Sequence, residues 1–311
     1  DEDPGLVFLS VLPVHHAFCL TMDWLNGFWL GAVLCINDSL MHMIRNMSIF
    51  EPDVMLMVPL MLETIYKRVK ALGADVPPEV LAKKVFGSRL TRIFTGGAHL
   101  DPYYIDEFKK YGISVFEGYG MSECSPVISS NKDGDCKPGS IGRPLPNVEI
   151  KFENGEICVR GTSVMKGYYN MDKETEETLR DGWLHTGDKG YIDEDGFLFI
   201  NGRVKNLIIL SNGENISPEE IETKLALNDL ICEIVVTGED NLLTSRIFPE
   251  PEAVQNMSEE ELSAALQKIL DDYNKEQPTY KQLSNLVIRK NPFFKNSSRK
   301  IIRTEVLRDE A

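Results

Sequence analysis

The chain has 311 residues, 42% of them hydrophobic and 26% charged, which is the composition of a globular protein large enough for two or more domains. Its formal net charge of −15 argues against non-specific binding to nucleic acid, because such binding needs a basic surface. The longest apolar run, residues 24–36, is too short to cross a bilayer as a helix. We therefore expect a cytosolic protein without an integral membrane span.

The cysteines show neither a CxxC pair nor the Cys/His spacing that is typical of zinc sites. This spacing predicts reduced thiols and no structural zinc. The six residues are Cys19, Cys35, Cys124, Cys136, Cys158 and Cys232.

Strands and helices are expected to alternate through the first part of the chain. Apolar, β-rich runs predict buried strands at residues 7–12, 53–59, 90–97 and 114–120. Helical spacing of apolar residues predicts helices at about residues 22–34, 60–73 and 102–112. This alternation indicates a parallel sheet flanked by helices, in an α/β subdomain over residues 1–136.

The pattern changes after about Lys137. Short strand-like runs at 148–152, 155–161 and 190–202 predict a β-barrel-like subdomain over residues 137–203, with a hairpin turn at its end. The remaining residues, 204–311, mix short apolar runs with two helical stretches, which is typical of a small α+β domain.

The first C-terminal helix has a clear start signal. Ser217 is the expected N-cap, Pro218 the first helical residue, and acidic side chains follow in the first turn. The second helix is expected from Ser258 to about Asn274.

A glycine-rich segment, GYGMSE, occupies residues 118–123 at the end of a predicted strand. Parallel sheets bind ligands at the carboxyl ends of their strands, where GGA at 96–98 also falls. Tyr119 between glycines leaves a ring face open for stacking, Ser122 can donate to an anionic oxygen, and Glu123 can hold magnesium. A plain glycine-rich turn with a solvated acid is the open alternative for this segment alone.

Three further segments carry groups suited to a nucleotide. Asp188, within LHTGDKGY, could accept both hydroxyls of a ribose, and Arg203 could hold a sugar or phosphate bidentately. Gly213 opens a loop where the backbone must approach a ligand or take a positive φ. The basic run KNSSRKIIR (295–303) could bring an ammonium to a reacting carboxylate or phosphate. Taken singly, an aspartate that caps a turn, a linker with an ordinary helix cap and a basic solvated tail stay open as alternatives.

The order and spacing of these segments resemble the acyl-adenylate-forming superfamily, which includes acyl-CoA synthetases. LPVHHAF (12–18) is similar to its LPxxH segment, and GYGMSE is similar to YGxTE with serine in place of threonine. LHTGDKGYIDEDGFLFINGR (184–203) is similar to its TGD…GR stretch, and KNSSRKIIR to the segment that holds the catalytic lysine. The resemblance covers nearly the whole chain, and the motifs are most similar to those of bacterial long-chain fatty-acyl-CoA ligases.

The resemblance implies roles for individual residues of the first part. Tyr119 would stack on adenine beside Gly120, Ser122 would contact the AMP phosphate, and Glu123 would ligate magnesium. Asp188 would bind the ribose hydroxyls. The wall between the nucleotide and acyl pockets would be lined by Gly96, Gly97 and Ala98. His16 would lie near the acyl carboxylate.

Further roles fall on the C-terminal part. Arg203 would help Asp188 with the ribose, Lys205 would be the hinge between a large and a small domain, and Gly213 would enter the site when the small domain rotates. Lys300 would bridge the carboxylate and the α-phosphate during adenylation. Arg299 stands where the family usually has glycine, which weakens the register of that last assignment.

The implied reaction is activation of a carboxylic acid, in this style of motif a fatty acid, by Mg·ATP to acyl-AMP, followed by transfer to CoA. The implied partners are thus a small carboxylate, ATP and CoA; a homo-oligomer and a peripheral contact with a membrane are compatible with them. A carrier-protein or amine acceptor, and a non-catalytic AMP-binding remnant, stay open as alternatives.

One family segment is missing from the chain. Relatives carry a Ser/Thr/Gly-rich loop, upstream of LPxxH, whose donors surround the β- and γ-phosphates of ATP. No similar segment occurs in these 311 residues. We therefore expect the chain to be the C-terminal part of a longer enzyme, to expose apolar surface, and to be inactive in adenylation by itself.

Overall fold

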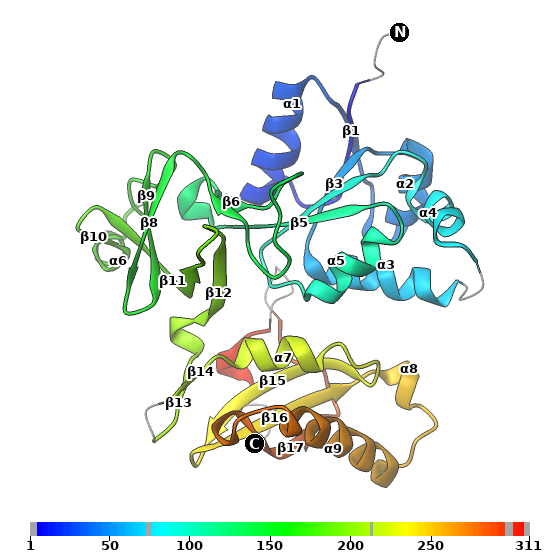
Figure 1. Ribbon diagram of the computed structural model, residues 1–311, viewed down its shortest axis with the longest axis vertical. Coiled ribbons are helices and arrows are strands. Elements are labelled where there is room, and N and C mark those ends of the chain that lie inside the picture. Colours follow the sequence, from blue (N-terminus) through cyan, green and yellow to red (C-terminus); the bar gives the residue numbers. More distant parts are fainter. Residues whose placement is uncertain (1–4, 73–75, 212–213, 296–300, 308–311) are drawn as a thin grey trace. The chain divides into compact units, whose positions relative to one another are not determined.

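The computed structural model describes residues 5–72, 76–211, 214–295 and 301–307 (Figure 1). The chain divides into two compact units, residues 1–200 and 201–311, which are described separately here. The predicted α/β class, with a parallel sheet, a β-rich part and a small α+β part, is confirmed. The predicted limits at residues 136 and 203 stay predictions.

A seven-stranded sheet organises the first unit, in the order β2-β1-β3-β4-β5-β6-β7. Its first five strands pair in parallel, and β5-β6-β7 pair in antiparallel fashion. The strands are β1 (Val7–Ser10), β2 (Val33–Ile36), β3 (Val54–Met57), β4 (Arg92–Thr95), β5 (Ser114–Gly120), β6 (Val127–Ser130) and β7 (Arg143–Pro144).

Helices connect these strands, as the alternating pattern predicts. They are η1 (Cys19–Leu25), α1 (Asn26–Leu30), η2 (Leu40–His42), α2 (Met43–Phe50), α3 (Pro59–Ala71), α4 (Pro78–Phe86), α5 (Pro102–Lys109) and η3 (Ser122–Cys124). Proline at the first position of α3 and α5 fits a helix start, because its missing N–H has no partner there anyway.

The prediction of one helix over residues 22–34 was wrong at both ends. A π-helical turn, η1, begins at Cys19 and continues into α1, which stops at Gly31 with φ +66°. The following apolar residues form the strand β2, which pairs in parallel with β1. A short apolar run has no period that separates helix from strand, so Gly31 was the only local signal of the boundary.

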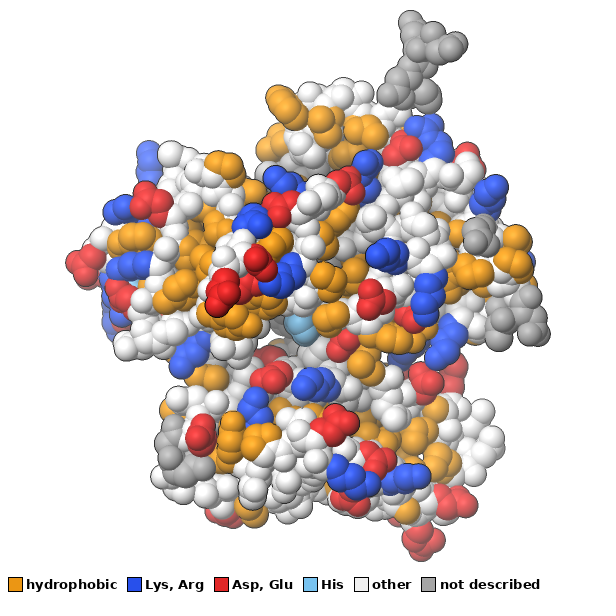
Figure 2. All heavy atoms as spheres, in the orientation of Figure 1, with side chains coloured by type: hydrophobic (Ala, Val, Ile, Leu, Met, Phe, Trp, Pro, Cys, Tyr) orange, Lys and Arg blue, Asp and Glu red, His pale blue; other side chains and the backbone are white. Residues whose placement is uncertain are grey.

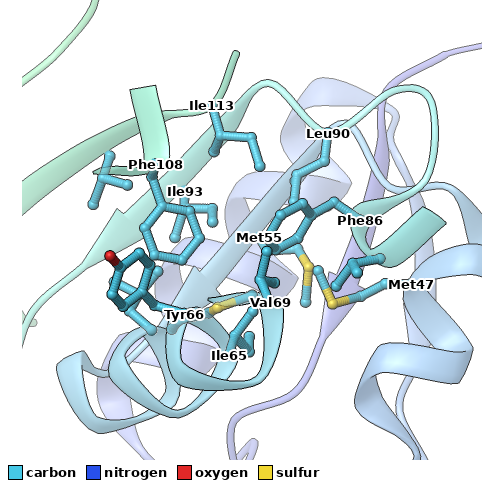
Figure 3. Packing of buried hydrophobic residues seen from close by; sticks show 14 of the residues in the cluster. Met47, Met55, Ile65, Tyr66, Val69, Phe86, Leu90, Ile93, Phe108 and Ile113 are labelled. Atoms are coloured by element: carbon cyan, nitrogen blue, oxygen red, sulfur yellow. The ribbon is translucent and has the colours of Figure 1, made fainter. Parts of the chain in front are cut away.

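The core of the sheet lies between the strands and the helices that cover them (Figure 3). Met55 and Ile93 from the strands, and Phe86 and Phe108 from the helices, are 0–1% exposed. The rings of Phe86 and Phe108 lie 5.8 Å apart, a tilted arrangement that aromatic pairs favour. This packing fixes the strands whose carboxyl ends carry the candidate site.

A second, antiparallel sheet completes the first unit, in the order β10-β11-β9-β8, with β12 paired to β11. Its buried side is apolar, with Ile157, Val159, Leu184 and Leu198 all 0% exposed. The elements are β8 (Val148–Glu153), β9 (Glu156–Gly161), α6 (Asp172–Thr178), β10 (Leu179–Arg180), β11 (Trp183–Ile192) and β12 (Leu198–Arg203).

The second unit has its own three-stranded sheet, β15-β16-β17, and a two-stranded one, β13-β14. Helices α7 and α9 contribute Ile221, Leu225, Leu266 and Leu270 to its core. The elements are η4 (Val204–Asn206), β13 (Ile208–Ile209), β14 (Asn215–Ile216), α7 (Pro218–Leu225), β15 (Ile231–Glu239), β16 (Leu242–Pro249), α8 (Pro251–Val254), α9 (Glu259–Lys275), η5 (Thr279–Lys281), β17 (Leu283–Ile288) and η6 (Arg303–Glu305).

The two predicted helix starts differ in detail. Ser217 holds the N-cap position of α7, but its hydroxyl bonds to the Glu219 carboxylate and caps no backbone N–H. Ser258 forms a full capping box with Glu261 at the start of α9. None of the described helices is long and apolar enough to cross a membrane.

Apolar side chains are exposed around α1 and the edge strand β2. Hydrophobic side chains gather over α1 in Figure 2, where Trp29 is 81% and Phe28 62% exposed. On β2, Val33 is 51% and Ile36 62% exposed. The expectation of exposed apolar surface is therefore confirmed.

We predict different costs for two glycine substitutions in the first unit. Both Gly142 and Gly134 have positive φ, but an added Cβ at Gly142 would lie 1.9 Å from the Ser130 carbonyl carbon, whereas one at Gly134 meets nothing within 4 Å. Gly134→Ala should lower the free energy of unfolding by roughly 1–2 kcal/mol, from backbone strain alone. Gly142→Ala should cost roughly 1–3 kcal/mol more, from overlap.

Urea unfolding followed by tryptophan fluorescence measures this difference. All three tryptophans, Trp24, Trp29 and Trp183, belong to the first unit, so the signal reports that unit alone. Equal costs for the two variants would contradict the close packing at Gly142.

Candidate functional site

The centre of the candidate site is a hydrogen bond between the two sheets of the first unit. The Tyr119 hydroxyl, at the end of β5, donates to Asp188 Oδ2 on β11 at 2.6 Å, across 69 residues of sequence. Tyr119 is 9% and Asp188 6% exposed. Burial and the neighbouring carboxylate raise the pKa of Tyr119 well above its usual value, so the phenol keeps its proton and acts as the donor.

The backbone around Asp188 is held by local bonds. The Asp188 N–H donates to Thr186 Oγ1 at 3.1 Å, and Thr186 Oγ1 donates to the Ile157 carbonyl at 2.8 Å. Gly187 takes φ +73°, and its N–H donates to Glu156 Oε1 at 2.9 Å. The strand is therefore irregular here, and its register with β9 shifts between His185 and Lys189. The residues of the TGD motif, 186–188, therefore form the irregular part of the strand.

The GGA segment lies against the end of β5. A Cβ on Gly96 would come within 2.8 Å of the Gly118 carbonyl oxygen, so only glycine fits there. The same position lies 4.0 Å from the Phe18 ring, which places the 12–18 segment beside this loop. Gly97 has φ +82°, and Ala98 is exposed.

His16 lies in that neighbouring segment and is exposed. Its Nδ1 accepts a hydrogen bond from the Phe18 N–H at 3.3 Å, which orients the ring. The ring is thus accessible for a ligand, and its role toward an acyl carboxylate stays a prediction.

Glu123 is held by two contacts, from Met165 and Tyr168. The Tyr168 hydroxyl donates to Glu123 Oε1 at 2.7 Å, and the Met165 N–H donates to the Glu123 carbonyl at 2.7 Å. The second oxygen, Oε2, has no hydrogen-bond partner among the described residues. Ser122 is exposed at the start of η3, and a Cβ on Gly120 would come within 2.0 Å of the Pro126 carbonyl oxygen.

A carboxylate with one oriented oxygen and one unengaged oxygen suits a hard cation such as magnesium. The donor chemistry at Glu123 therefore fits the metal that the motif predicts. Sequence reasoning missed Tyr168 as its partner, because the two residues lie 45 positions apart in the chain.

The remaining predicted residues belong to the second unit. Arg203 ends β12, Lys205 lies in η4, and both are exposed. Gly213 and Lys300 lie outside the described residues. The structure thus brings Tyr119 to Asp188 and Gly96 to β5, while the roles of the C-terminal residues stay predictions.

Sequence reasoning also missed a buried acid two residues before Tyr119 on the same strand. Glu117 is 3% exposed, and its Cα partner across the sheet is Thr95 at the end of β4. Glu117 Oε1 accepts from the Leu100 N–H at 3.3 Å, whereas Glu117 Oε2 and Thr95 Oγ1 have no partner among the described residues. Burial raises the pKa of Glu117 to about 8, so the side chain is largely protonated at neutral pH. The signal was an acid within an apolar strand.

These features define an α/β protein with a polar site at the carboxyl ends of its parallel strands. Residues 1–169 match the AMP-binding enzyme family, and residues 205–309 match the AMP-binding enzyme C-terminal domain. The chain therefore belongs to the AMP-binding enzyme family, and the predicted superfamily is confirmed.

Proteins with similar sequences include CoA ligases. A long-chain-fatty-acid–CoA ligase of Mycobacterium bovis is 28% identical over 291 residues, which cover 81% of this chain and 48% of that protein. One of Bacillus subtilis is 44% identical over 165 residues, 49% of this chain and 29% of that protein. The chain spans about half the length, or less, of these relatives.

Solved structures of other proteins share this fold. The O-succinylbenzoate coenzyme A synthetase of Bacillus subtilis, in complex with ATP and magnesium ion, has a TM-score of 0.77 and 26% identity. The match covers 97% of this chain and 61% of that one. ATP-bound MatB from Rhodopseudomonas palustris has a TM-score of 0.78 and 25% identity, over 99% of this chain and 60% of that one.

Glu117 predicts a pH dependence of stability. Its folded pKa of about 8 lies above the usual 4.5, so between these values the folded state keeps a proton that the unfolded state has lost. Stability therefore falls as pH rises through this window, by at most ~1.4 kcal/mol per pH unit. Asp23, whose pKa burial raises to about 6, has the same sign but acts below pH 6.

Glu117→Gln should remove this dependence between about pH 6 and 8, because glutamine keeps the shape and carries no titrating proton. Urea midpoints from tryptophan fluorescence at several pH values measure the slope. Glu174→Gln, on the exposed helix α6, is the control and should keep the slope of the original chain. An unchanged slope in Glu117→Gln would contradict the raised pKa.

Proposed function

We propose that this chain forms the AMP-binding part of an acid–CoA ligase that activates a fatty acid through acyl-AMP. The observation that carries the proposal is the buried bond from Tyr119 to Asp188, which joins the two motif segments beside the GGA loop. Family membership supports the adenylate chemistry. The acid and the acceptor are inferred from the names of the relatives, which include 2-succinylbenzoate–CoA ligases as well as fatty-acid ligases.

Asp188 is the group that would accept the ribose hydroxyls. Its carboxylate is 6% exposed and already fixed by the Tyr119 hydroxyl, so binding costs little side-chain ordering. The Tyr119 ring would stack on adenine. The close approach of Gly96 to β5 leaves the backbone of this loop, rather than a side chain, to face the nucleotide.

Glu123 would hold magnesium through Oε2, while Tyr168 keeps Oε1 oriented. When bound, the ion would neutralise charge on the phosphate oxygens. Ser122, exposed at the start of η3, would donate its hydroxyl to the phosphate of AMP.

The two half-reactions need different groups. The substrate carboxylate attacks the α-phosphorus of ATP, forming the acyl–phosphate bond and releasing pyrophosphate; Lys300 would stabilise the developing charge with its ammonium. The CoA thiolate then attacks the acyl carbon, the bond to phosphate breaks, and AMP leaves. Lys205 would be the hinge that lets the domain of Lys300 turn between the steps. A cytosolic enzyme with CoA as acceptor is the version we propose.

AMP binding tests the nucleotide site on this chain. We expect calorimetric titration to show binding of AMP, and tighter binding of a non-hydrolysable acyl-AMP analogue. Asp188→Asn should weaken AMP roughly tenfold to a hundredfold, because it removes a charged acceptor of hydrogen bonds. Asp195→Asn, in the exposed turn before β12, is the matched control and should bind like the original chain. Full AMP affinity in a folded Asp188→Asn would refute the ribose role.

Lys300 tests the chemistry in the longer enzyme that the sequence predicts. In Lys300→Ala, carboxylate-dependent exchange of pyrophosphate into ATP should collapse, while thioester formation from supplied acyl-AMP continues. The first half-reaction alone depends on the ammonium at the α-phosphate. Equal loss of both half-reactions would disprove this division.

A further inference from the structure

A cluster of metal-ligating side chains lies on the second sheet, away from the groups assigned above. Cys158 on β9 is the direct cross-strand partner of His185 on β11 and of Lys151 on β8. Glu153, at the end of β8, lies on the same face two residues beyond Lys151. The three strands are neighbours in the sheet (Figure 1). Ligand atoms of Glu153, Cys158 and His185 all lie within 4.8 Å of one another.

The distances between these atoms are close to those around a single ion. His185 Nε2 lies 3.7 Å from Glu153 Oε2 and 4.0 Å from Cys158 Sγ. In a tetrahedral zinc site, with bonds of about 2.0–2.3 Å, neighbouring ligand atoms are about 3.4–3.6 Å apart. The two separations that involve His185 need shifts of roughly half an ångström, and the separation between Glu153 and Cys158 is at most 4.8 Å, which needs a shift of up to about an ångström to reach the tetrahedral distance.

A fourth residue orients the histidine. Glu156 Oε2 lies 2.9 Å from His185 Nδ1, and Glu156 Oε1 accepts from the Gly187 N–H at 2.9 Å. A carboxylate at Nδ1 favours the proton there, which leaves the lone pair of Nε2 available to an ion beside Glu153. Cys158 Sγ lies 3.5 Å from Nδ1 and 4.0 Å from Nε2, so the thiol has to shift toward Nε2 to share that ion. This carboxylate–histidine pairing is the usual support of a metal-bound imidazole.

The neighbouring cations leave the ligand atoms available. Lys151 Nζ pairs with Glu153 Oε1, the oxygen that does not face His185. Arg180 lies 3.6 Å from Glu156 Oε2, on the residue that orients and does not bind. Cys158 is 0% and His185 8% exposed, whereas the Glu153 side chain is 45% exposed and opens the cluster to solvent.

We propose that Cys158, His185 and Glu153 bind a borderline divalent transition-metal ion, with Zn²⁺ as the preferred ion and water as its fourth ligand. Sulfur, imidazole and carboxylate together select zinc or cobalt over magnesium and calcium, which take oxygen ligands. The ion would connect β8, β9 and β11 on the face opposite their apolar core. It is a site separate from the magnesium assigned to Glu123.

Cobalt titration tests the proposal on the chain as it is. After treatment with a chelator, one equivalent of Co²⁺ should give the visible absorption of a tetrahedral site and a sulfur-to-cobalt charge-transfer band, and Zn²⁺ should displace it. Zn²⁺ should also raise the Tm of the chain, since it binds only the folded state. Absence of stoichiometric binding would leave an ion-pair network only and overturn the proposal.

Variants assign the ligands. Cys158→Ser should abolish the charge-transfer band, whereas Cys136→Ser, at an exposed cysteine elsewhere, should keep it. Glu153→Gln should weaken Zn²⁺, and Glu149→Gln, an exposed acid on the same strand that pairs with Arg160, should not. Glu156→Gln should weaken Zn²⁺ about tenfold to a hundredfold through loss of orientation.

Because the Glu153 side chain is half exposed, Glu153→Gln should leave the fold intact, and tryptophan fluorescence verifies the fold of each variant. A charge-transfer band that survives in Cys158→Ser, or equal effects of Glu153→Gln and Glu149→Gln, would overturn the assignment.

Discussion

The bond between Tyr119 and Asp188 is the interaction on which the candidate site depends. It joins the end of a parallel strand to an irregular point of an antiparallel one, and both partners are almost fully buried. A buried carboxylate is stable only with a donor, and a buried phenol needs an acceptor, so each residue satisfies a need of the other. The two sheets of the first unit are thus connected by a polar contact as well as by apolar packing. Of the residues assigned to the nucleotide and its metal ion, Tyr119, Ser122 and Glu123 lie in one of the segments that this contact connects, and Asp188 lies in the other.

Glycines set the second constraint. At Gly96, Gly120 and Gly142 an added Cβ would meet backbone atoms, so these segments pass each other at distances that no side chain permits. The backbone itself then lines the carboxyl edge of the sheet, and the polar side chains project from a few fixed places. This explains why the motif segments are rich in glycine where they lie near the parallel strands.

Much of the fold could be predicted because its signals are local. Strand β5 coincides with its predicted range, and the parallel order follows from alternation of strands with helices. The end of the helix before β2 could not be predicted well, since a short apolar run suits either state. Of the site, the motif residues were found through their order along the chain. Tyr168, the partner of Glu123, and the buried Glu117 were missed, because a side-chain contact or the burial of an acid depends on packing that residue spacing does not show.

The cysteines show the same limit most clearly. Spacing along the chain predicts no zinc site, yet cross-strand pairing sets Cys158 beside His185, which lies 27 residues away. Metal ligands with short helical or loop spacing are visible in a sequence, whereas ligands on neighbouring strands are separated by whatever the connections require.

Glu156 gives these two regions a shared element. One of its oxygens faces the His185 ring, and the other holds the N–H of Gly187, the residue directly before Asp188. An ion bound to the His185 imidazole would act on Glu156 directly. A ribose bound to Asp188 would act on the same carboxylate through the neighbouring Gly187 N–H. Any change that one ligand makes in the affinity for the other must be reciprocal, because the coupling free energy belongs to the pair. Glu156 would then be the point where metal content and nucleotide affinity are thermodynamically linked.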